Sequence, residues 1–519
     1  MELKRIILHR RQEKGNAVSQ ITLDDDYNVP DYRPDIVKVL KEKGELRFDE
    51  VKAGNSALWV KGSLNFKVLY RSEQENGGIS CLRGEIPFQE KLNMDGLQDY
   101  EPVRVQGEVE DITIGVINSR KLNVRAVVVL RAVAEEERTE ELTCGLEDGE
   151  EYEQKFKERE VLQLLLAKKD ICRQKNEIVL PSSKPNVREI LWRSIELRNV
   201  ESRLGDGRAG VTGEILLSVL YSDEEDGDRL QWYETTVPLD AGTECELDET
   251  DVVHRIRAVP ASMEVEVKPD YDGEERILVL ELALELDIRV WREERVELLD
   301  DLYSLKKEVV PIRKEHKTER LLVKNYAKSR LAETIELTEQ QEKILQICAC
   351  EGKAVIEREE LTPEGVLAEG IVQVELLYIT TDDHMPVGVV KEIFPFRQVV
   401  EVSDMPAQTR VELDGGIEQL SAIMLDQEHI EIKALIHLDL MAFAEETADN
   451  IESIEEKALD MEKLKNSPGL TGYIAREGDE LWNIAKENHT TVRSIMNTNP
   501  IKGERLSAGE RILIVKQVG

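Results

Sequence analysis

The 519-residue sequence has few aromatic residues and no long apolar run. Aromatic residues make up 5% of it, and apolar stretches such as residues 126–130 reach only five residues, whereas a membrane-spanning helix needs about 20. Near the amino terminus, basic clusters flank residues 6–8, an apolar segment too short for a secretory signal peptide. We therefore expect a cytosolic protein without a direct membrane span.

The sequence also lacks the motifs of common catalytic and metal sites. Its six cysteines share no framework spacing, and Cys348 and Cys350 lack the two-residue gap of common zinc and redox motifs. The seven histidines form no HExxH pattern, and there is no phosphate-binding GxxxxGK[ST] loop or GxSxG nucleophile turn. We expect reduced cysteines, no metal, no cofactor, no catalytic residues and no enzymatic activity.

One acidic segment, residues 223–228, superficially resembles a calcium-binding loop. If Gly227 holds position six of such a loop, Tyr233 falls on position twelve, where a bidentate carboxylate is required. A solvated hairpin tip fits these residues better.

Basic residues are outnumbered by acidic ones. The sequence has 69 basic and 106 acidic residues, which gives a formal net charge of −37. A chain this acidic repels phosphate backbones, so we expect no binding to nucleic acid or anionic membranes. Residues 471–519 differ, with seven basic and six acidic residues, and indicate a separate module.

What the sequence does contain is a threefold repeat. Each copy begins with a glycine, reaches a tyrosine eight residues later and a proline 17 residues after that: Gly62, Tyr70 and Pro87; Gly213, Tyr221 and Pro238; Gly370, Tyr378 and Pro395. Positions two, four, six and eight after each glycine are apolar, which predicts a strand with one better-buried face. Since proline cannot donate to a sheet ladder, the strand that carries it is predicted to be an edge strand.

The repeat extends upstream of the glycines. Residues 29–36 and 180–187 share two prolines, whereas residues 337–344 lack them and keep only the apolar ends. Short strands with turn signals at this spacing predict a mainly β fold with three tandem β-sandwich-like modules. We place them at residues 1–150, 151–305 and 306–446, and expect helical linkers at stretches such as residues 158–166 and 319–324. Residues 447–470 are expected to form an acidic, helix-prone linker.

Over residues 20–445 the repeats resemble the SPOCS domain, a module of proteins that assemble the coat of bacterial endospores. The resemblance implies a non-enzymatic role in coat morphogenesis.

The last module, residues 471–516, has a compact pattern. A strand at residues 473–476 precedes a helix at residues 481–486, for which Asp479 is the expected N-cap, and Thr491 is placed to cap a second helix. A strand at residues 511–515 follows. This βααβ pattern, with residues 478–485, Asn499, Pro500 and residues 509–514 at matching spacing, resembles a LysM domain.

LysM domains as a family hold N-acetylglucosamine-containing glycans in a shallow groove. Carried over to this sequence, the groove consists of Gly478, Asp479, Glu480 and Leu481 on one side and Asn499, Pro500 and Ile501 on the other. Glycan-binding members usually have Thr or Ser at the position of Glu480, and a carboxylate only accepts hydrogen bonds. A purely structural interpretation also fits, with Asp479 as a cap, Leu481 in the core and Pro500 ending a helix.

The combination of SPOCS repeats with a C-terminal LysM domain resembles the coat-morphogenesis adaptors of spore-forming clostridia. It implies an adaptor in the mother-cell cytoplasm at the forespore surface that binds a SpoIVA-like coat ATPase and other coat proteins. Two alternatives stay open: a peptidoglycan-binding protein of the cortex or cell wall, and modules that self-assemble through unpaired sheet edges.

Overall fold

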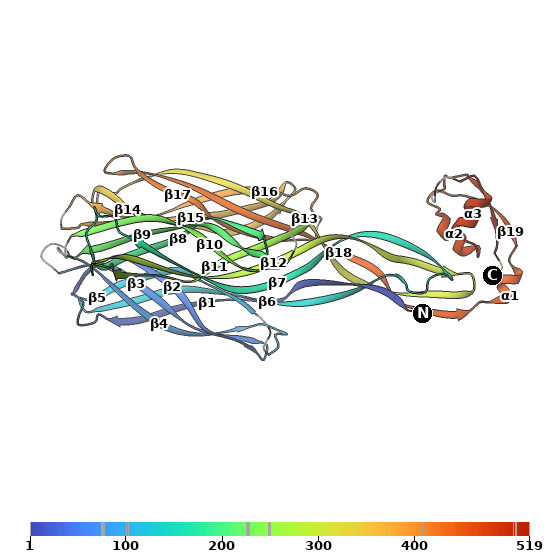
Figure 1. The fold of residues 1–519 in the computed structure, drawn as a ribbon, viewed down its shortest axis with the longest axis horizontal. Helices are drawn as coiled ribbons and strands as arrows, with labels where there is room; N and C mark the ends of the chain where they lie inside the picture. The colour runs from blue at the N-terminus through green and yellow to red at the C-terminus, as the bar shows by residue number, and fades with distance from the viewer. Residues whose placement is uncertain are drawn as a thin grey trace.

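In the computed structural model, the chain folds into three six-stranded β units and a small C-terminal module. The molecule is long, with the sandwiches of the three units at one end and the C-terminal module at the other (Figure 1). The structure describes residues 2–73, 78–99, 101, 103–224, 229–247, 251–382, 384–406, 408–501, 503 and 506–517. Gly227, on which the comparison with a calcium-binding loop depends, lies outside the described residues.

The three units repeat one strand sequence. The strands of the first unit are β1 (Leu3–Asn28), β2 (Ile36–Gly54), β3 (Ala57–Ser72), β4 (Ile79–Asn93), β5 (Val103–Asn118) and β6 (Lys121–Leu146). Those of the second are β7 (Tyr152–Val179), β8 (Val187–Gly205), β9 (Arg208–Asp223), β10 (Leu230–Glu244), β11 (Val252–Pro269) and β12 (Glu275–Ser304). Those of the third are β13 (Lys307–Glu336), β14 (Ile344–Thr362), β15 (Gly365–Thr380), β16 (Val387–Glu401), β17 (Thr409–Met424) and β18 (His429–Ala458).

Each unit contains two three-stranded antiparallel sheets of the same order. One sheet is β2-β3-β4, β8-β9-β10 or β14-β15-β16, and the other is β1-β6-β5, β7-β12-β11 or β13-β18-β17. The predicted mainly β fold with repeated sheets is therefore confirmed. The second strand of each pattern, which carries Pro87, Pro238 or Pro395, lies at the edge of its sheet, as predicted.

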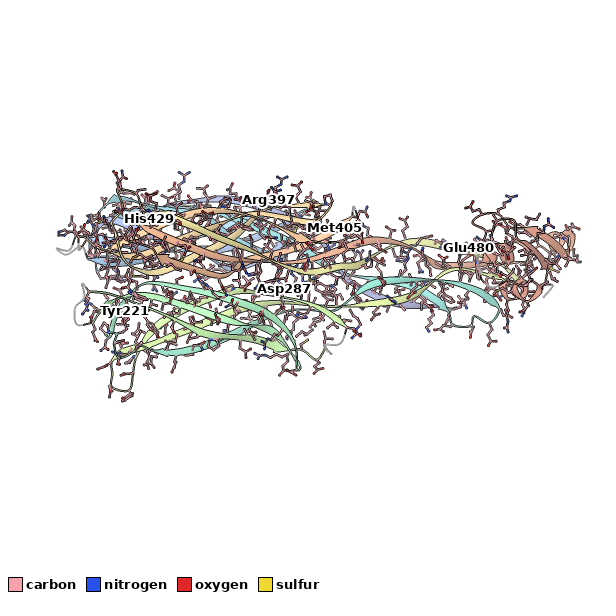
Figure 2. All side chains as sticks on the ribbon, turned by 90° about the horizontal axis from the view of Figure 1, so that it is seen from above. Tyr221, Asp287, Arg397, Met405, His429 and Glu480 are labelled. Carbon is pink, nitrogen blue, oxygen red and sulfur yellow. The ribbon has the colours of Figure 1, made fainter. Side chains whose placement is uncertain are left out.

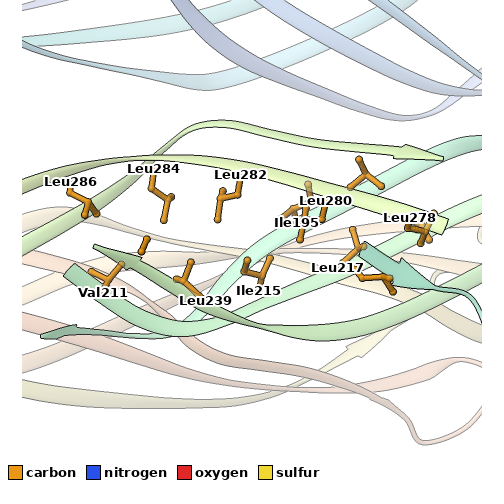
Figure 3. Packing of buried hydrophobic residues seen from close by; sticks show 14 of the residues in the cluster. Ile195, Val211, Ile215, Leu217, Leu239, Leu278, Leu280, Leu282, Leu284 and Leu286 are labelled. Carbon is orange, nitrogen blue, oxygen red and sulfur yellow. The ribbon is translucent and has the colours of Figure 1, made fainter. Parts of the chain in front are cut away.

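The core of each unit lies between its two sheets, as Figure 3 shows for the second unit. On β12, alternate residues from Leu278 to Leu286 are leucines with at most 2% exposure. They pack against Ile215 and Leu217 of β9 in one cluster. The period of two in the sequence therefore places one face of each strand in the core.

The repeated tyrosine makes the same contact in all three units. The hydroxyl groups of Tyr70, Tyr221 and Tyr378 each donate to the backbone carbonyl 36 residues upstream, at 3.1, 3.3 and 3.2 Å. All three rings are buried, and burial raises the pKa of Tyr221 and Tyr378 to about 12. The third unit keeps this bond although its turn has lost both prolines, because the acceptor is a backbone oxygen.

The repeated glycine lies where two strands approach closely. A Cβ atom on Gly62 would lie 2.3 Å from the carbonyl oxygen of Arg47, and one on Gly370 would lie 2.2 Å from that of Val355. In both units the neighbouring strand has a register shift next to this point. A side chain cannot fit against the bulged backbone, so the position requires glycine.

The predicted helical linkers are wrong. Residues 158–166 lie in β7, and residues 319–324 lie in β13. Both segments pair along their length with the last strand of their own unit, β12 or β18. Such short apolar runs do not distinguish a helix from a strand by period alone, and the distant partner strand decides the outcome. Residues 447–458 likewise belong to β18, and only α1 (Met461–Asn466) of the acidic segment is helical.

The first and last strands of each unit continue beyond the sandwich. The pairing of β5 with β6 ends at Ala134, but β1 and β6 continue as a two-stranded ribbon as far as Leu3 and Leu146. The pairs β7–β12 and β13–β18 do the same beyond Arg292 and Ala444. We call these three ribbons the stalk; it extends from the sandwiches toward the C-terminal module (Figure 1).

Side chains hold the ribbons of the stalk together. The backbone N–H of Thr143 donates to the Asn450 side chain (2.6 Å), and the amide of Asn450 donates back to the Thr143 carbonyl (3.1 Å). Leu146, Leu299 and Ile451 form a buried cluster that includes all three ribbons. The stalk is therefore a packed structure rather than three separate arms.

The three units also meet at a common junction. Leu69, Leu220 and Leu377, each directly before a repeat tyrosine, are buried in one cluster. Lys41 of β2 is fully buried and pairs with Glu351 of β14 (3.1 Å) and Glu375 of β15 (2.7 Å). The indole N–H of Trp192, on β8, donates to Glu351 (2.9 Å). Burial opposes ionisation of Glu351, but Lys41 and Lys43 beside it lower its pKa to about 2.

Candidate functional site

The C-terminal module contains two short helices on a two-stranded sheet. After α1 come β19 (Leu470–Ile474), α2 (Leu481–Glu487), α3 (Val492–Thr498) and β20 (Arg511–Val515), and β19 pairs antiparallel with β20. The strand-helix-helix-strand order predicted from the sequence is confirmed.

The two helix caps differ in how well the sequence predicted them. The Thr491 side chain accepts a hydrogen bond from the Ser494 N–H (3.1 Å) and caps α3 as expected. At α2 the N-cap position is held by Glu480 instead of Asp479. Asp479 closes the preceding turn, accepting from the Arg476 N–H and the Tyr473 hydroxyl, both at 2.8 Å. These two bonds lower the pKa of the Asp479 carboxyl group.

Residues on the first side of the predicted groove have distinct environments. Gly478 is exposed and has a φ of 92°, which favours glycine. Leu481 is fully buried in the core of the module. Glu480 accepts a hydrogen bond at 2.7 Å from Lys155, which lies on β7 in the stalk. The carboxylate that departs from the glycan-binding pattern is thus paired within the chain.

On the second side, the Asn499 side chain joins α3 to β20. Its amide group donates to the carbonyls of Ile495 (2.9 Å) and Leu513 (2.8 Å), and its carbonyl accepts from the Leu513 N–H (2.8 Å). Ile501 packs on the core of the module, and Pro500 is exposed. Asn499 and Leu481 therefore have structural roles, and Gly478 and Pro500 are the exposed members of the predicted set.

The tip of the stalk contacts one face of α2. The indole N–H of Trp482 donates to Asp301 (2.8 Å), and the Lys486 ammonium group contacts both oxygens of the same carboxylate, at 2.7 and 2.8 Å. The Tyr303 ring meets the Trp482 ring edge to face, with centroids 4.9 Å apart. Burial opposes ionisation of Asp301, but the bonds from Lys486 and Trp482 lower its pKa overall.

Two further bonds fix the module to the end of β12 and to the turn that follows it. The buried hydroxyl of Tyr303 donates to the Thr490 carbonyl (2.9 Å), and burial raises its pKa. The His489 Nε2 atom lies 2.8 Å from the Leu305 carbonyl, a contact that requires a proton on Nε2. Figure 2 shows Glu480 at this end of the molecule, far from Tyr221 and His429. The module is docked at the tip of the stalk.

Sequence reasoning missed the residues of this docking surface. Trp482 and Lys486 are four residues apart, so they lie on the same face of α2. Trp482 belongs to the same buried cluster as Leu481, Ile484 and Ala485, and this cluster also includes Tyr303 of the stalk. A tryptophan and a lysine together on one face of α2 were the available signal, but their partner, Asp301, is remote in sequence.

Family models match three parts of this chain. The model described as "SipL, SPOCS domain" matches residues 35–117 and 343–425, and the LysM domain model matches residues 473–515. The chain is a SPOCS- and LysM-domain protein. Both kinds of domain are non-catalytic.

The two SPOCS matches cover equivalent parts of the first and third units. Residues 35–117 contain β2 to β5, and residues 343–425 contain β14 to β17. The second unit has the same strand order and sheets in the structure. The first and last strands of each unit, which build the stalk, lie outside the matched ranges.

Comparisons with curated protein sequences and with solved structures reveal no further relative of this chain. No curated protein sequence matches the SPOCS–LysM chain. Among solved structures, the ferric yersiniabactin uptake receptor FyuA from Yersinia pestis aligns at 9% identity over 80% of this chain and 81% of that chain. Its TM-score of 0.11 supports no shared fold.

Within the described residues, no group of three or more His, Cys, Asp or Glu side chains is arranged to hold a metal ion. No helix of the described part is long and apolar enough to span a membrane.

Proposed function

We propose that the chain is a non-enzymatic adaptor of spore-coat assembly, which binds coat proteins through its SPOCS units and through the LysM domain. The match to SPOCS and LysM models supports a spore-coat protein. The observation that carries the adaptor function is the position of the LysM domain, which the stalk separates from the three sandwiches (Figure 1). Binding surfaces at two distant ends suit a protein that joins two layers, because linked weak contacts raise the effective concentration.

For the LysM domain we propose a protein partner, a SpoIVA-like coat ATPase, with the contact at the predicted groove. The chain would then act in the mother-cell cytoplasm at the forespore surface. Glu480 argues against a glycan partner, because a carboxylate cannot donate a hydrogen bond to a sugar and this one is already paired with Lys155. The exposed Gly478 and Pro500 are the groove residues available to a partner. We also propose the strand limits of the three units as the limits of the SPOCS domains.

The test is capture of the purified coat ATPase by the full-length chain. Pro500→Arg should abolish capture, since it places a long charged side chain on the exposed side of the groove. Ile474→Arg is the matched control, because Ile474 is 60% exposed on the outer face of β19. Capture that survives both Pro500→Arg and removal of residues 459–519 would contradict a LysM contact.

A second candidate is binding of peptidoglycan, which the LysM match favours. Retention of the full-length chain on purified peptidoglycan, lost in Pro500→Arg and kept in Ile474→Arg, would support it. If the wild-type chain is not retained while it captures the coat ATPase, the glycan alternative is wrong.

A further inference from the structure

The outer face of the sheet β2-β3-β4 has an exposed tryptophan surrounded by basic side chains. Trp59 is 40% exposed and points away from the core, since its neighbours Leu58 and Val60 are fully buried. It pairs across the sheet with Lys52 on β2 and Lys91 on β4. The Lys91 ammonium group lies 5.3 Å from the centre of the Trp59 ring.

The next row of the sheet completes this surface. Lys61 pairs with Glu50 on one side and Gln89 on the other, and its ammonium group lies 3.2 Å from the Glu50 carboxylate. A depression of about 300 Å³ is lined by Glu50, Lys52, Trp59, Lys61 and Gln89. We call these residues with Lys91 the Trp59 platform. It has three lysines and one glutamate in a chain with a net charge of −37.

The second unit presents an exposed aromatic ring that is flanked by acidic residues instead of basic ones. Tyr271, in the turn between β11 and β12, is 96% exposed and lies between Asp270 and Asp272, with Glu274 two residues farther on. The turn is ordered by its own bonds: the Asp270 carboxylate accepts from the N–H groups of Asp272 (2.9 Å) and Glu274 (3.0 Å). We call residues 270–274 the Tyr271 loop. A preorganised loop loses little conformational entropy on binding.

Neither feature is part of the repeat. The position of Trp59, three residues before the repeat glycine, is held by Gly210 in the second unit and by the buried Leu367 in the third. The link that corresponds to the Tyr271 loop is two residues long in the first unit, between Asn118 and Lys121. The shared fold therefore requires neither exposed ring.

The platform and the loop lie at opposite ends of the sandwiches. β12 ends in the stalk at Ser304, so its first residue and the Tyr271 loop lie at the far end. β2 begins at that far end, where the Ile36 N–H donates to the Ser119 carbonyl, and runs toward the stalk. Trp59, directly after the β2–β3 turn, therefore lies on the stalk side. The two surfaces cannot meet within one molecule.

We propose that the Trp59 platform binds the Tyr271 loop of a second copy of the chain. The tyrosine ring packs on Trp59 in the depression, and the carboxylates beside it face Lys52, Lys61 and Lys91. The contact uses different surfaces on the two copies, so it is heterologous and builds open chains of molecules instead of a closed dimer. This self-association goes beyond the adaptor function and does not depend on the LysM groove.

The formation of this contact depends on ionic strength. Two chains of net charge −37 repel each other at long range. At an ionic strength of about 0.15 M the screening length is about 8 Å, which reduces the repulsion between whole molecules more than the attraction between charges in contact. Association is therefore expected at this ionic strength and is weakened when salt is withdrawn.

The test is sedimentation velocity of the full-length chain over a concentration series. Wild-type protein should form oligomers whose mass increases with protein concentration. Trp59→Ala and Tyr271→Ala should each weaken association about 30-fold, the loss of one central aromatic contact. Tyr32→Ala and Leu361→Ala are controls, because these side chains are 80% and 50% exposed and belong to neither surface. Circular dichroism verifies that each variant is folded.

Mixing the two variants separates this arrangement from others. Trp59→Ala keeps an intact loop and Tyr271→Ala keeps an intact platform, so an equimolar mixture should form dimers but no longer species. Lys91→Glu should weaken association, and Asp272→Lys in the same chain should restore part of it. A monomeric wild type at all concentrations, association unchanged by either alanine variant, or no dimers in the mixture would each overturn the proposal. Loss of association in Trp59→Ala alone would assign a different occupant to the platform and overturn the pairing with the loop.

Discussion

The two faces of β3 illustrate two kinds of interior in this molecule. On one face, Leu64, Phe66 and Val68 pack inside the sandwich of the first unit. On the other face, Leu69 joins the junction of the three units, and Lys67 lies over the Trp192 ring of the second unit, 4.7 Å from its centre. The sandwich interior is apolar, and the junction contains buried charges.

The apolar interior of a sandwich makes each unit fold, whereas the buried charges of the junction fix the units relative to one another. Apolar burial drives folding but has no direction, so many packings satisfy it. The contacts of Lys41 with Glu351 and Glu375 require one relative position of the first and third units. We therefore expect changes in a sandwich core to unfold a unit, and changes at the junction to loosen the arrangement of units.

The largest effect is expected inside a sandwich. Tyr221→Ala should lower the free energy of unfolding by about 3–5 kcal/mol, since it leaves a large cavity in the core. Tyr221→Phe keeps the ring and removes only the bond to the Pro185 carbonyl, with a loss of about 1 kcal/mol. Chemical denaturation of the two variants measures the difference. Equal losses would show that the hydrogen bond, and not the packing of the ring, stabilises the unit.

A smaller effect is expected from the charge at the junction. Glu351→Gln should cost about 2 kcal/mol, because the buried Lys41 loses one of its two carboxylate partners. Hydrogen exchange should increase in β2 and β8 at the junction while the core strand β12 stays protected.

A double variant is the control for this prediction. Replacing Lys41 by Met together with Glu351 by Leu removes one cation and one carboxylate of this network, and should cost less than the sum of the two single replacements. If the double variant loses the sum of the two, the pair does not act as a unit.

A further effect depends on pH and concerns Lys67. Burial, with Arg83, Arg193 and Lys43 nearby and the partly opposing influence of Cys81, lowers its pKa from 10.5 to about 7. Between these two values the unfolded chain binds more protons than the folded one, so stability rises with pH over this window. Lys67→Met should therefore stabilise the protein most below pH 7, and the gain should fade toward pH 10.5. Thermal unfolding from pH 6 to pH 10 measures it; a gain that does not change with pH would contradict the assignment.

The regular parts of the fold could be predicted from the sequence. The glycine–tyrosine repeat, the alternating apolar positions and the edge-strand prolines each reflect a local constraint of sheet geometry, and so they appear within a few residues. The helix order of the LysM domain is similarly local. The cap of α2 was misplaced by one residue, because Asp479 bonds back to Arg476 and Tyr473 instead of forward.

The candidate site could be predicted only in part. The motif gave its residues, and their spacing around α2 and α3 is kept in the structure. That the groove binds a partner stays a prediction. Its pairing with the stalk was not predictable, because Lys155 and Asp301 lie 325 and 181 residues from their partners Glu480 and Trp482.

The sequence by itself determined the number of units, the faces of their strands and the separate module at the end, because these depend on residues near one another in the chain. The tertiary structure decided the rest. Segments such as residues 158–166 became strands of the stalk because a partner strand more than 100 residues away satisfies their backbone hydrogen bonds. The position of the LysM domain was decided in the same way, by Asp301 and Tyr303 near the end of β12, whose distance from the module no local pattern reveals.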